Sequence, residues 1–270
     1  MAIQIGVFLP TSGPRIAGSG AAHVRASART AEAAGLESIW ASDHLIAGQP
    51  MLDSTVALAT AAAVTDRIRI GFGAMLPALR PIAWAAKEIS TLQQLSDGRV
   101  LLGVGTGNPA HGDIGWRAAG VPFEERGTRT DRALAVLPDL VAGKQVTLND
   151  GLEVALSPGT SIPPILIAGN SARARRRAAA HGDSWMPIDP GLERLPQLLA
   201  ELRELAQRYE RPTPAITVVA PALPAEPRRA AAALAAYEAA GVERVILAPT
   251  GPDWQRDYAF AAELGAREGR

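Results

Sequence analysis

The chain has 270 residues, of which 47% are hydrophobic and 20% are charged, so it can bury a large core and long disordered segments are not expected. Lys plus Arg and Asp plus Glu both number 27, and this zero net charge disfavours a nucleic-acid partner, which would need a basic excess or stripe. Cysteine is absent, which excludes disulfides, thiolate nucleophiles and cysteine-based metal sites and favours a reducing cytoplasm.

Short apolar runs alternate with longer amphipathic stretches along the whole chain, and each run is nearly continuous, as in buried parallel strands. The predicted strands are Ile3–Leu9, Ser38–Ala41, Ile68–Gly73, Val100–Gly105, Ile165–Ala168, Trp185–Pro187, Ala215–Ala220 and Val242–Leu247. Eight strand–helix units predict a (β/α)₈ TIM barrel forming one domain over residues 1–270, with a doubly wound open sheet as the alternative. Residues 109–163 are predicted to form an insertion after the fourth strand, with a helix over about Phe123–Val141 and a hairpin over Val146–Leu156.

In a barrel of this kind, function belongs to the loops that follow the carboxyl ends of the strands. The second strand ends in Ser42, Asp43 and His44, which places two titratable groups at the barrel mouth. Asp43 could instead cap a turn, with His44 packed or solvated. The third strand ends in Gly71-Phe72-Gly73, where glycine permits either a close ligand approach or simple relief of crowding.

The fourth strand ends in Gly103-Val104-Gly105-Thr106-Gly107-Asn108, whose spacing does not fit a dinucleotide-binding fingerprint. Small residues beside Thr106 and Asn108 instead favour room for a flat ring with hydrogen-bonding groups at its edge. The fifth strand ends in Ala168-Gly169-Asn170-Ser171 and leads into a helix, so free backbone N–H groups predict a phosphate site there. The four arginines between positions 173 and 177 are interpreted as a solvated helix face.

Other catalytic motifs are missing. There is no P-loop, no His-Glu-x-x-His sequence and no Gly-x-Ser-x-Gly elbow, and the four histidines lack metal-ligand spacing, so we expect no metal site. The remaining groups favour a site that holds an organic cofactor and lets the cofactor supply the chemistry.

Several motifs taken together resemble one family. They are Ser38-x-Trp40-Ala41-Ser42-Asp43-His44, Arg67-Ile68-Arg69-Ile70-Gly71, the run from Ala86 to Gly107, the run from Gly120 to Gly127, and Pro163 to Ser171. Their order resembles the bacterial luciferase-like (β/α)₈ superfamily, on its coenzyme F420-dependent side. The similarity is clear over about residues 3–187 and extends by topology to the rest of the chain.

The resemblance implies a role for several positions. Asp43 and His44 match a pair beside the deazaflavin ring, with His44 as the catalytic or substrate-orienting group. Gly73, Ala74 and Met75 match a bulge behind the ring that often holds a non-prolyl cis peptide. Thr106 and Asn108 match cofactor contacts, and the turn Ala168, Gly169, Asn170 and Ser171 matches the phosphate site. Family members that oxidise sugar phosphates carry an acid at the position of Asn108, so that activity is not expected.

The sequence therefore predicts an F420-dependent oxidoreductase that transfers a hydride between the deazaflavin and a small organic substrate. Asp43 and His44 are the expected catalytic residues, and the insertion is expected to shape the substrate pocket. An FMN-dependent monooxygenase on the same barrel is the first alternative, because FMN shares the tricycle and the ribityl phosphate. A non-catalytic flavin-binding barrel is the second. The resemblance further implies a homodimer, and we expect neither a nucleic-acid nor a membrane partner.

Overall fold

A computed structural model describes residues 2–13, 16, 22–248 and 250–268. Eight parallel strands close into a barrel in the order β1-β10-β9-β8-β7-β4-β3-β2. Their bounds are β1 Gln4–Phe8, β2 Ser38–Ala41, β3 Arg69–Met75, β4 Val100–Val104, β7 Ile165–Ala168, β8 Ser184–Met186, β9 Ala215–Ala220 and β10 Arg244–Leu247. The predicted (β/α)₈ barrel is confirmed, and the open sheet is excluded because β1 pairs with both β2 and β10.

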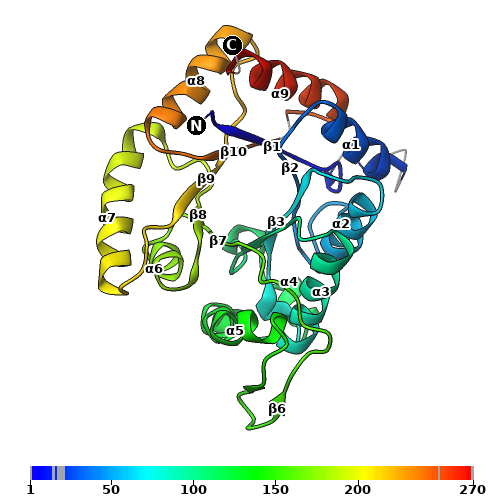
Figure 1. Ribbon diagram of the computed structural model, residues 1–270, viewed down its shortest axis with the longest axis vertical. Coiled ribbons are helices and arrows are strands. Elements are labelled where there is room, and N and C mark those ends of the chain that lie inside the picture. The colour runs from blue at the N-terminus through cyan, green and yellow to red at the C-terminus, as the bar shows by residue number, and fades with distance from the viewer. Residues whose placement is uncertain (1, 14–15, 17–21, 249, 269–270) are drawn as a thin grey trace.

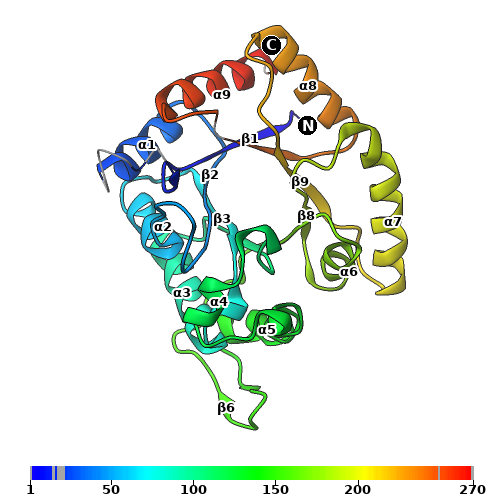
Figure 2. The same ribbon diagram turned by 180° about the vertical axis from the view of Figure 1, so that it is seen from behind.

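Helices surround the strands as an outer ring, with α9 closing the circle between α1 and α8 (Figures 1 and 2). The helices are α1 Ala22–Ala33, α2 Ser54–Ala62, α3 Ile82–Leu95, α4 Ile114–Ala118, α5 Arg126–Val141, α6 Ala172–His181, α7 Leu195–Arg208, α8 Pro227–Ala239 and α9 Trp254–Glu268. Short 3₁₀ turns are η2 Pro77–Leu79, η3 Pro109–His111, η4 Phe123–Glu125 and η5 Leu192–Arg194. Within the described ranges, no helix is both long and apolar enough to cross a membrane.

The insertion between β4 and β7 contains η3, α4, η4 and α5, followed by an antiparallel hairpin of β5 Val146–Thr147 and β6 Glu153–Val154. The hairpin projects outward from the ring beyond α5 (Figure 1). Helix α5 packs against α3, η2 and α6, so it occupies a place in the ring of barrel helices. The expected helix and hairpin of the insertion are therefore present, whereas α4 and η3 were not predicted.

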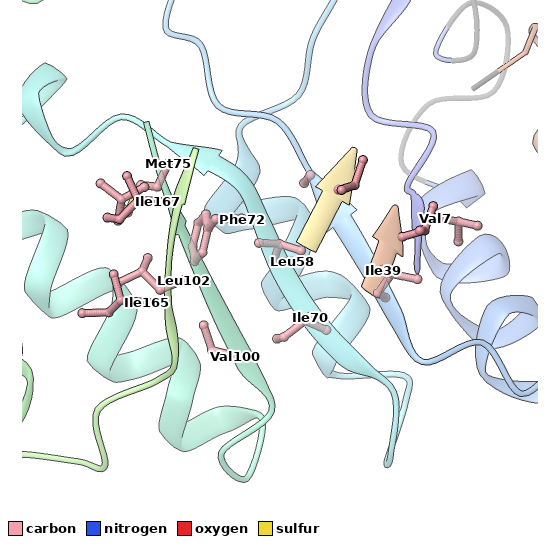
Figure 3. Packing of buried hydrophobic residues seen from close by; sticks show 14 of the residues in the cluster. Val7, Ile39, Leu58, Ile70, Phe72, Met75, Val100, Leu102, Ile165 and Ile167 are labelled. Atoms are coloured by element: carbon pink, nitrogen blue, oxygen red, sulfur yellow. The ribbon is translucent and has the colours of Figure 1, made fainter. Parts of the chain in front are cut away.

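Alternate residues of the strands face two separate apolar layers, because successive side chains of a strand point to opposite faces. The outer layer lies between strands and helices and includes Phe72, Leu102 and Ile167 (Figure 3). The inner layer fills the barrel with Trp40, Leu101, Leu166, Met186 and Ile246, and is joined by the partly buried Phe8, Ala74, Ala168 and Val219. These four residues and Met186 form the floor of the cavity described below.

Candidate active site

A cavity of about 1180 Å³ opens over the carboxyl ends of the barrel strands. It is large enough for a drug-sized organic ligand, since such sites usually hold roughly 300–1,000 Å³. The predicted residues that line it are Asp43, His44, Gly73, Ala74, Thr106, Asn108, Ala168, Gly169, Asn170 and Ser171. Residues from four separate strand ends are thus brought to one place, as expected for a barrel closed by parallel strands.

The exit of β3 forms part of the cavity wall through Gly73 and Ala74. The Gly73–Ala74 peptide bond is cis, as the resemblance implied, and the pairing of β3 with β4 shifts register between Phe72 and Met75. A Cβ atom added at Gly105 would lie 3.3 Å from the Cβ of Ala74, so the two strand ends pack closely and leave no bulky side chain between them. Small residues therefore leave room for a planar ring.

Met75 does not line this cavity, and its expected cofactor contact is corrected. Its side chain is fully buried in the outer apolar layer drawn in Figure 3. The bulge is the physical reason. Met75 lies three positions after Phe72, and regular alternation would turn it toward the inside of the barrel. The extra residue of the bulge restores both side chains to the same outer face.

Gly71 has a different role from Gly73. A Cβ atom at Gly71 would lie 2.2 Å from the ring of Trp40, whose indole N–H donates to the Ser38 hydroxyl at 2.8 Å inside the barrel. Gly71 therefore relieves crowding around a buried tryptophan. Gly73 instead borders the cavity, and its carbonyl accepts a hydrogen bond from the Ser42 hydroxyl.

The carboxylate of Asp43 is engaged by two groups of the protein itself. Both oxygens lie 3.0 Å from the Arg80 guanidinium, and one accepts the backbone N–H of Leu76 at 2.8 Å. Asp43 is only 4% exposed, while Arg80 also reaches Glu88 at 3.4 Å. Nearby carboxylates, chiefly Asp43, raise the pKa of Arg80 despite its burial. This network ties the end of β2 to the chain just after β3, whereas the catalytic role of Asp43 stays a prediction.

His44 is half-buried at the cavity wall, and its ring lies against the ring of His111. Burial lowers the pKa of His44, and the neighbouring His111 lowers it further, while Asp43 acts in the opposite direction. The side chain is therefore neutral near pH 7 and can accept a proton. The predicted placement of His44 at the barrel mouth agrees with this geometry.

Side chains of the turn after β7 fix its conformation through hydrogen bonds. Asn170 bridges to the backbone of Ile188, donating to the carbonyl at 2.6 Å and accepting the N–H at 2.8 Å. The Ser171 hydroxyl accepts the Ala174 N–H at 3.1 Å and so caps α6. Helix geometry leaves the N–H groups of Ala172 and Arg173 without an intrahelical acceptor. This pair is suited to an anion such as phosphate.

The interpretation of the α6 arginines as a solvated face holds for the exposed Arg173 and Arg176 and is wrong for Arg175 and Arg177. Arg175 is 8% exposed and binds Glu201 at 2.7 Å and the carbonyl of Asn170 at 2.9 Å. Arg173, Arg176 and Arg177 line the cavity, which continues along α6 past His181 to Tyr209. Arg177 pairs with Asp131 of α5. In the described part of the chain, Arg173 and Arg176 make no ion pair.

Thr106 and Asn108 lie where β4 leaves the barrel. Thr106 is half-buried at the cavity wall, while Asn108 uses its side-chain oxygen to accept the Ala110 N–H at 3.0 Å. Asn108 therefore shapes the chain that follows it, although it also lines the cavity. His111, which follows in η3, was missed by the sequence analysis as a site residue; the signal was its place three residues after Asn108 in a loop at a strand end.

Residues 3–269 match the family model described as luciferase-like monooxygenase. The chain belongs to this family. A relative in Mycobacterium tuberculosis, an F420-dependent hydroxymycolic acid dehydrogenase, is 30% identical over 175 residues, which are 60% of this chain and 47% of the relative. The chain thus spans about half the length of that relative. An F420-dependent glucose-6-phosphate dehydrogenase from Beutenbergia cavernae is 32% identical over 170 residues, which are 58% of this chain and 49% of the relative. These relatives confirm the predicted resemblance to the F420-dependent side of the family.

Solved structures with the same fold include enzymes of both cofactor types. An F420-dependent secondary alcohol dehydrogenase in complex with an F420–acetone adduct superposes with a TM-score of 0.82 at 16% identity, covering 98% of each chain. A riboflavin lyase with modified FMN superposes with a TM-score of 0.83 at 14% identity, covering 100% of this chain and 92% of the other. At these identities the likeness establishes the fold alone.

Proposed function

We propose that this member of the luciferase-like family is a coenzyme F420-dependent oxidoreductase that transfers a hydride between the deazaflavin and a small organic substrate. The sequence relatives that use F420 support this proposal. The observation that carries it is the basic extension of the cavity along α6. F420 bears an acidic chain beyond its phosphate, whereas FMN ends at the phosphate, so cations placed beyond a phosphate turn favour F420.

The residues of the cavity fit the parts of this cofactor in order. Gly73, Ala74 and Gly105 bring no bulky side chain to the wall and so leave room for a tricyclic ring. The free N–H groups at the start of α6 suit the phosphate, since both the orphan donors and the helix dipole favour an anion. Arg173 and Arg176, which lie one helical turn apart, suit the carboxylates that follow.

The chain itself binds the cofactor, orients the substrate and moves a proton. When bound, the deazaflavin supplies hydride transfer at its C5 atom. We infer that His44, which lines the cavity, holds the oxygen of an alcohol or carbonyl substrate and takes or returns the proton that accompanies the hydride. The insertion, which brings His111 and Glu124 to the wall, shapes the substrate side.

Paired titration of the purified protein with F420 and with FMN tests the cofactor. We expect quenching of F420 fluorescence at micromolar or lower concentration and no comparable response with FMN. Submicromolar binding of FMN with no response to F420 would instead favour an FMN-dependent monooxygenase. Binding without turnover of any alcohol or carbonyl would favour the non-catalytic barrel.

Three further expectations remain predictions. A homodimer is tested by light scattering of the purified chain, and a single domain by the cooperativity of unfolding. A cytoplasmic location is tested by fractionation of cells that express the chain.

A further inference from the structure

Two imidazole rings face each other at the rim of the active-site cavity. The centroids of His44 and His111 lie 4.8 Å apart with an interplanar angle of 52°, and both residues line the cavity. His44 follows β2, whereas His111 ends η3 in the insertion. The contact therefore joins the barrel to the insertion at the wall of the cavity.

His111 is held in place by the turn that follows β4. The carbonyl of Asn108 accepts the His111 N–H at 3.0 Å, and the Asn108 side chain caps the same turn through the Ala110 N–H. Gly107 has a φ of 77°, and a Cβ atom there would lie 2.9 Å from the ring of Trp116. The turn is thus fixed by a cap and by packing, and it presents the His111 ring to His44.

The remaining charges around His44 are neutralised or lie elsewhere. Asp43, the next residue in the chain, is paired with Arg80, which also contacts Glu88. The other charged side chains of the cavity wall belong to residues 124–131 and to α6. In the described part of the chain, no hydrogen bond is made by the His44 side chain. His111 is therefore the ring partner that acts on His44 from the insertion.

We propose that His111 is a positioning residue for His44, packing against its ring at the cavity wall and holding that ring ready to accept the proton of a substrate hydroxyl. The inference rests on the proposed function, since it assigns a partner to the proton-transfer group of that reaction. It gives the insertion a role in the proton step in addition to shaping the pocket.

In the oxidising direction the atoms balance as follows. The substrate O–H bond breaks and its proton goes to a ring nitrogen of His44. The electron pair of the adjacent C–H bond leaves with its hydrogen as a hydride to F420, and the carbon–oxygen double bond forms. A second proton acceptor is not required, and His111 acts only through the state and orientation of His44.

Nuclear magnetic resonance of the cofactor-free protein tests the pairing directly. The chain has only four histidines, so their ring Cε1–H signals can be followed separately as pH varies. His111→Phe keeps an aromatic ring without a charge, and His111→Gln keeps a polar group. Because His111 lowers the pKa of His44, we expect the midpoint of His44 to rise in both variants. His23→Gln, at the start of α1, is the matched control and should leave that midpoint unchanged.

A midpoint for His44 that is the same in wild type and in both His111 variants would overturn the proposal. If the two variants instead moved it in opposite directions, the effect would come from packing, and the proposal would also fail. Thermal unfolding of each variant verifies that the fold is retained. Because no cofactor is present, failure of F420 binding, which would remove the proposed function, leaves this test interpretable.

Turnover supplies the second readout. At neutral pH we expect kcat/KM for alcohol oxidation to fall about twofold in His111→Gln, since a His44 pKa that returns toward the ordinary 6.5 still leaves most of the ring neutral. The ascending limb of the pH profile should move to higher pH, in the same direction as the midpoint of His44, while the affinity for F420 stays as in wild type. An unchanged pH profile would overturn the proposal even if the rate fell.

Discussion

The two sides of the cavity use polar residues in different ways. On the side of β2 and β3, the carboxylate of Asp43 pairs with Arg80 and accepts the backbone N–H of Leu76, so it stabilises the cavity wall. On the side of β7 and α6, Arg173 and Arg176 stay unpaired within the described residues and face the cavity. Charged groups at strand ends thus serve the fold on one side and remain available to a ligand on the other.

Breaking the buried pair should produce the largest effect. Asp43→Ala leaves the N–H of Leu76 without its acceptor and the guanidinium of Arg80 with only its longer contact to Glu88, and we expect the free energy of unfolding to fall by about 3 kcal/mol. Chemical denaturation measures this change. Glu88→Gln removes the more exposed carboxylate from the same arginine and is the control, with an expected loss below about 1 kcal/mol. Equal losses in the two variants would show that Asp43 has no special structural role.

Removing the proposed proton acceptor should have the next largest effect, on rate instead of stability. His44→Ala is expected to lower turnover by about 100-fold, because general acid–base catalysis contributes roughly that much or more. Steady-state kinetics and F420 titration of the same preparation measure it, and the F420 affinity should change little. Turnover equal to wild type would remove His44 from the mechanism.

On the side of β7 and α6, the two hydrogen bonds between Asn170 and the backbone of Ile188 can be removed by a single substitution. Asn170→Ala removes two hydrogen bonds to Ile188, so we expect the unfolding free energy to fall by about 1–2 kcal/mol and the affinity for F420 to fall as the turn relaxes. Asn170→Asp keeps the acceptor for the Ile188 N–H but loses the donor, and it should lie between alanine and wild type. If Asn170→Ala bound F420 with wild-type affinity, the hydrogen bonds between Asn170 and Ile188 would have no role in cofactor binding.

The exposed side chains of Arg173 and Arg176 should contribute less to F420 binding. The double variant Arg173→Gln/Arg176→Gln is expected to weaken F420 binding about fivefold at low salt and less at high salt, because exposed charges are screened. FMN binding should be unaffected. Arg228→Gln/Arg229→Gln on α8 changes the net charge equally and is the matched control. A similar loss of F420 affinity in both double variants would show a general charge effect without a tail site.

The smallest effect concerns pH and stability. Burial lowers the pKa of both His44 and His181 from the ordinary value of 6.5, with His111 adding to the effect at His44 and Arg211 at His181. The folded protein therefore prefers both rings neutral, and unfolding takes up protons below pH 6.5. Stability is complete above that pH and declines as the pH falls through the lowered pKa values. Denaturation between pH 8 and 5 measures the slope, which His181→Gln should reduce; a slope of zero would contradict the shifts.

The strands were predictable because apolar runs in a barrel are buried on both faces, and three of the eight have the predicted bounds. The placement of Asp43, His44 and the turn Ala168–Ser171 followed from strand ends meeting at one rim. Met75 was misplaced because the bulge changes the alternation of β3: the resemblance implied the bulge but not the face to which it turns Met75.

The contact of His111 with His44 could not be predicted, since it depends on a capped turn after Gly107 and on the packing of Trp116. The surroundings of the α6 arginines were missed for a related reason, although Arg173 and Arg176 are exposed as predicted. A single helix shows which residues share a face, but only the approach of α5 determines that Arg173 and Arg176 border a cavity and that Arg177 meets Asp131. Local sequence patterns predict helices and strands well, but they predict the contacts and cavities between those elements poorly.

The projecting hairpin has a practical use. Its tip at Asp150 and Gly151 is exposed, Gly151 has a φ of 84°, and only two residue pairs hold β5 to β6. Such tips accept inserted sequence with little penalty because few backbone hydrogen bonds depend on them. A peptide tag placed there would allow immobilisation of the chain on a sensor surface with the barrel mouth left unobstructed for cofactor and substrate.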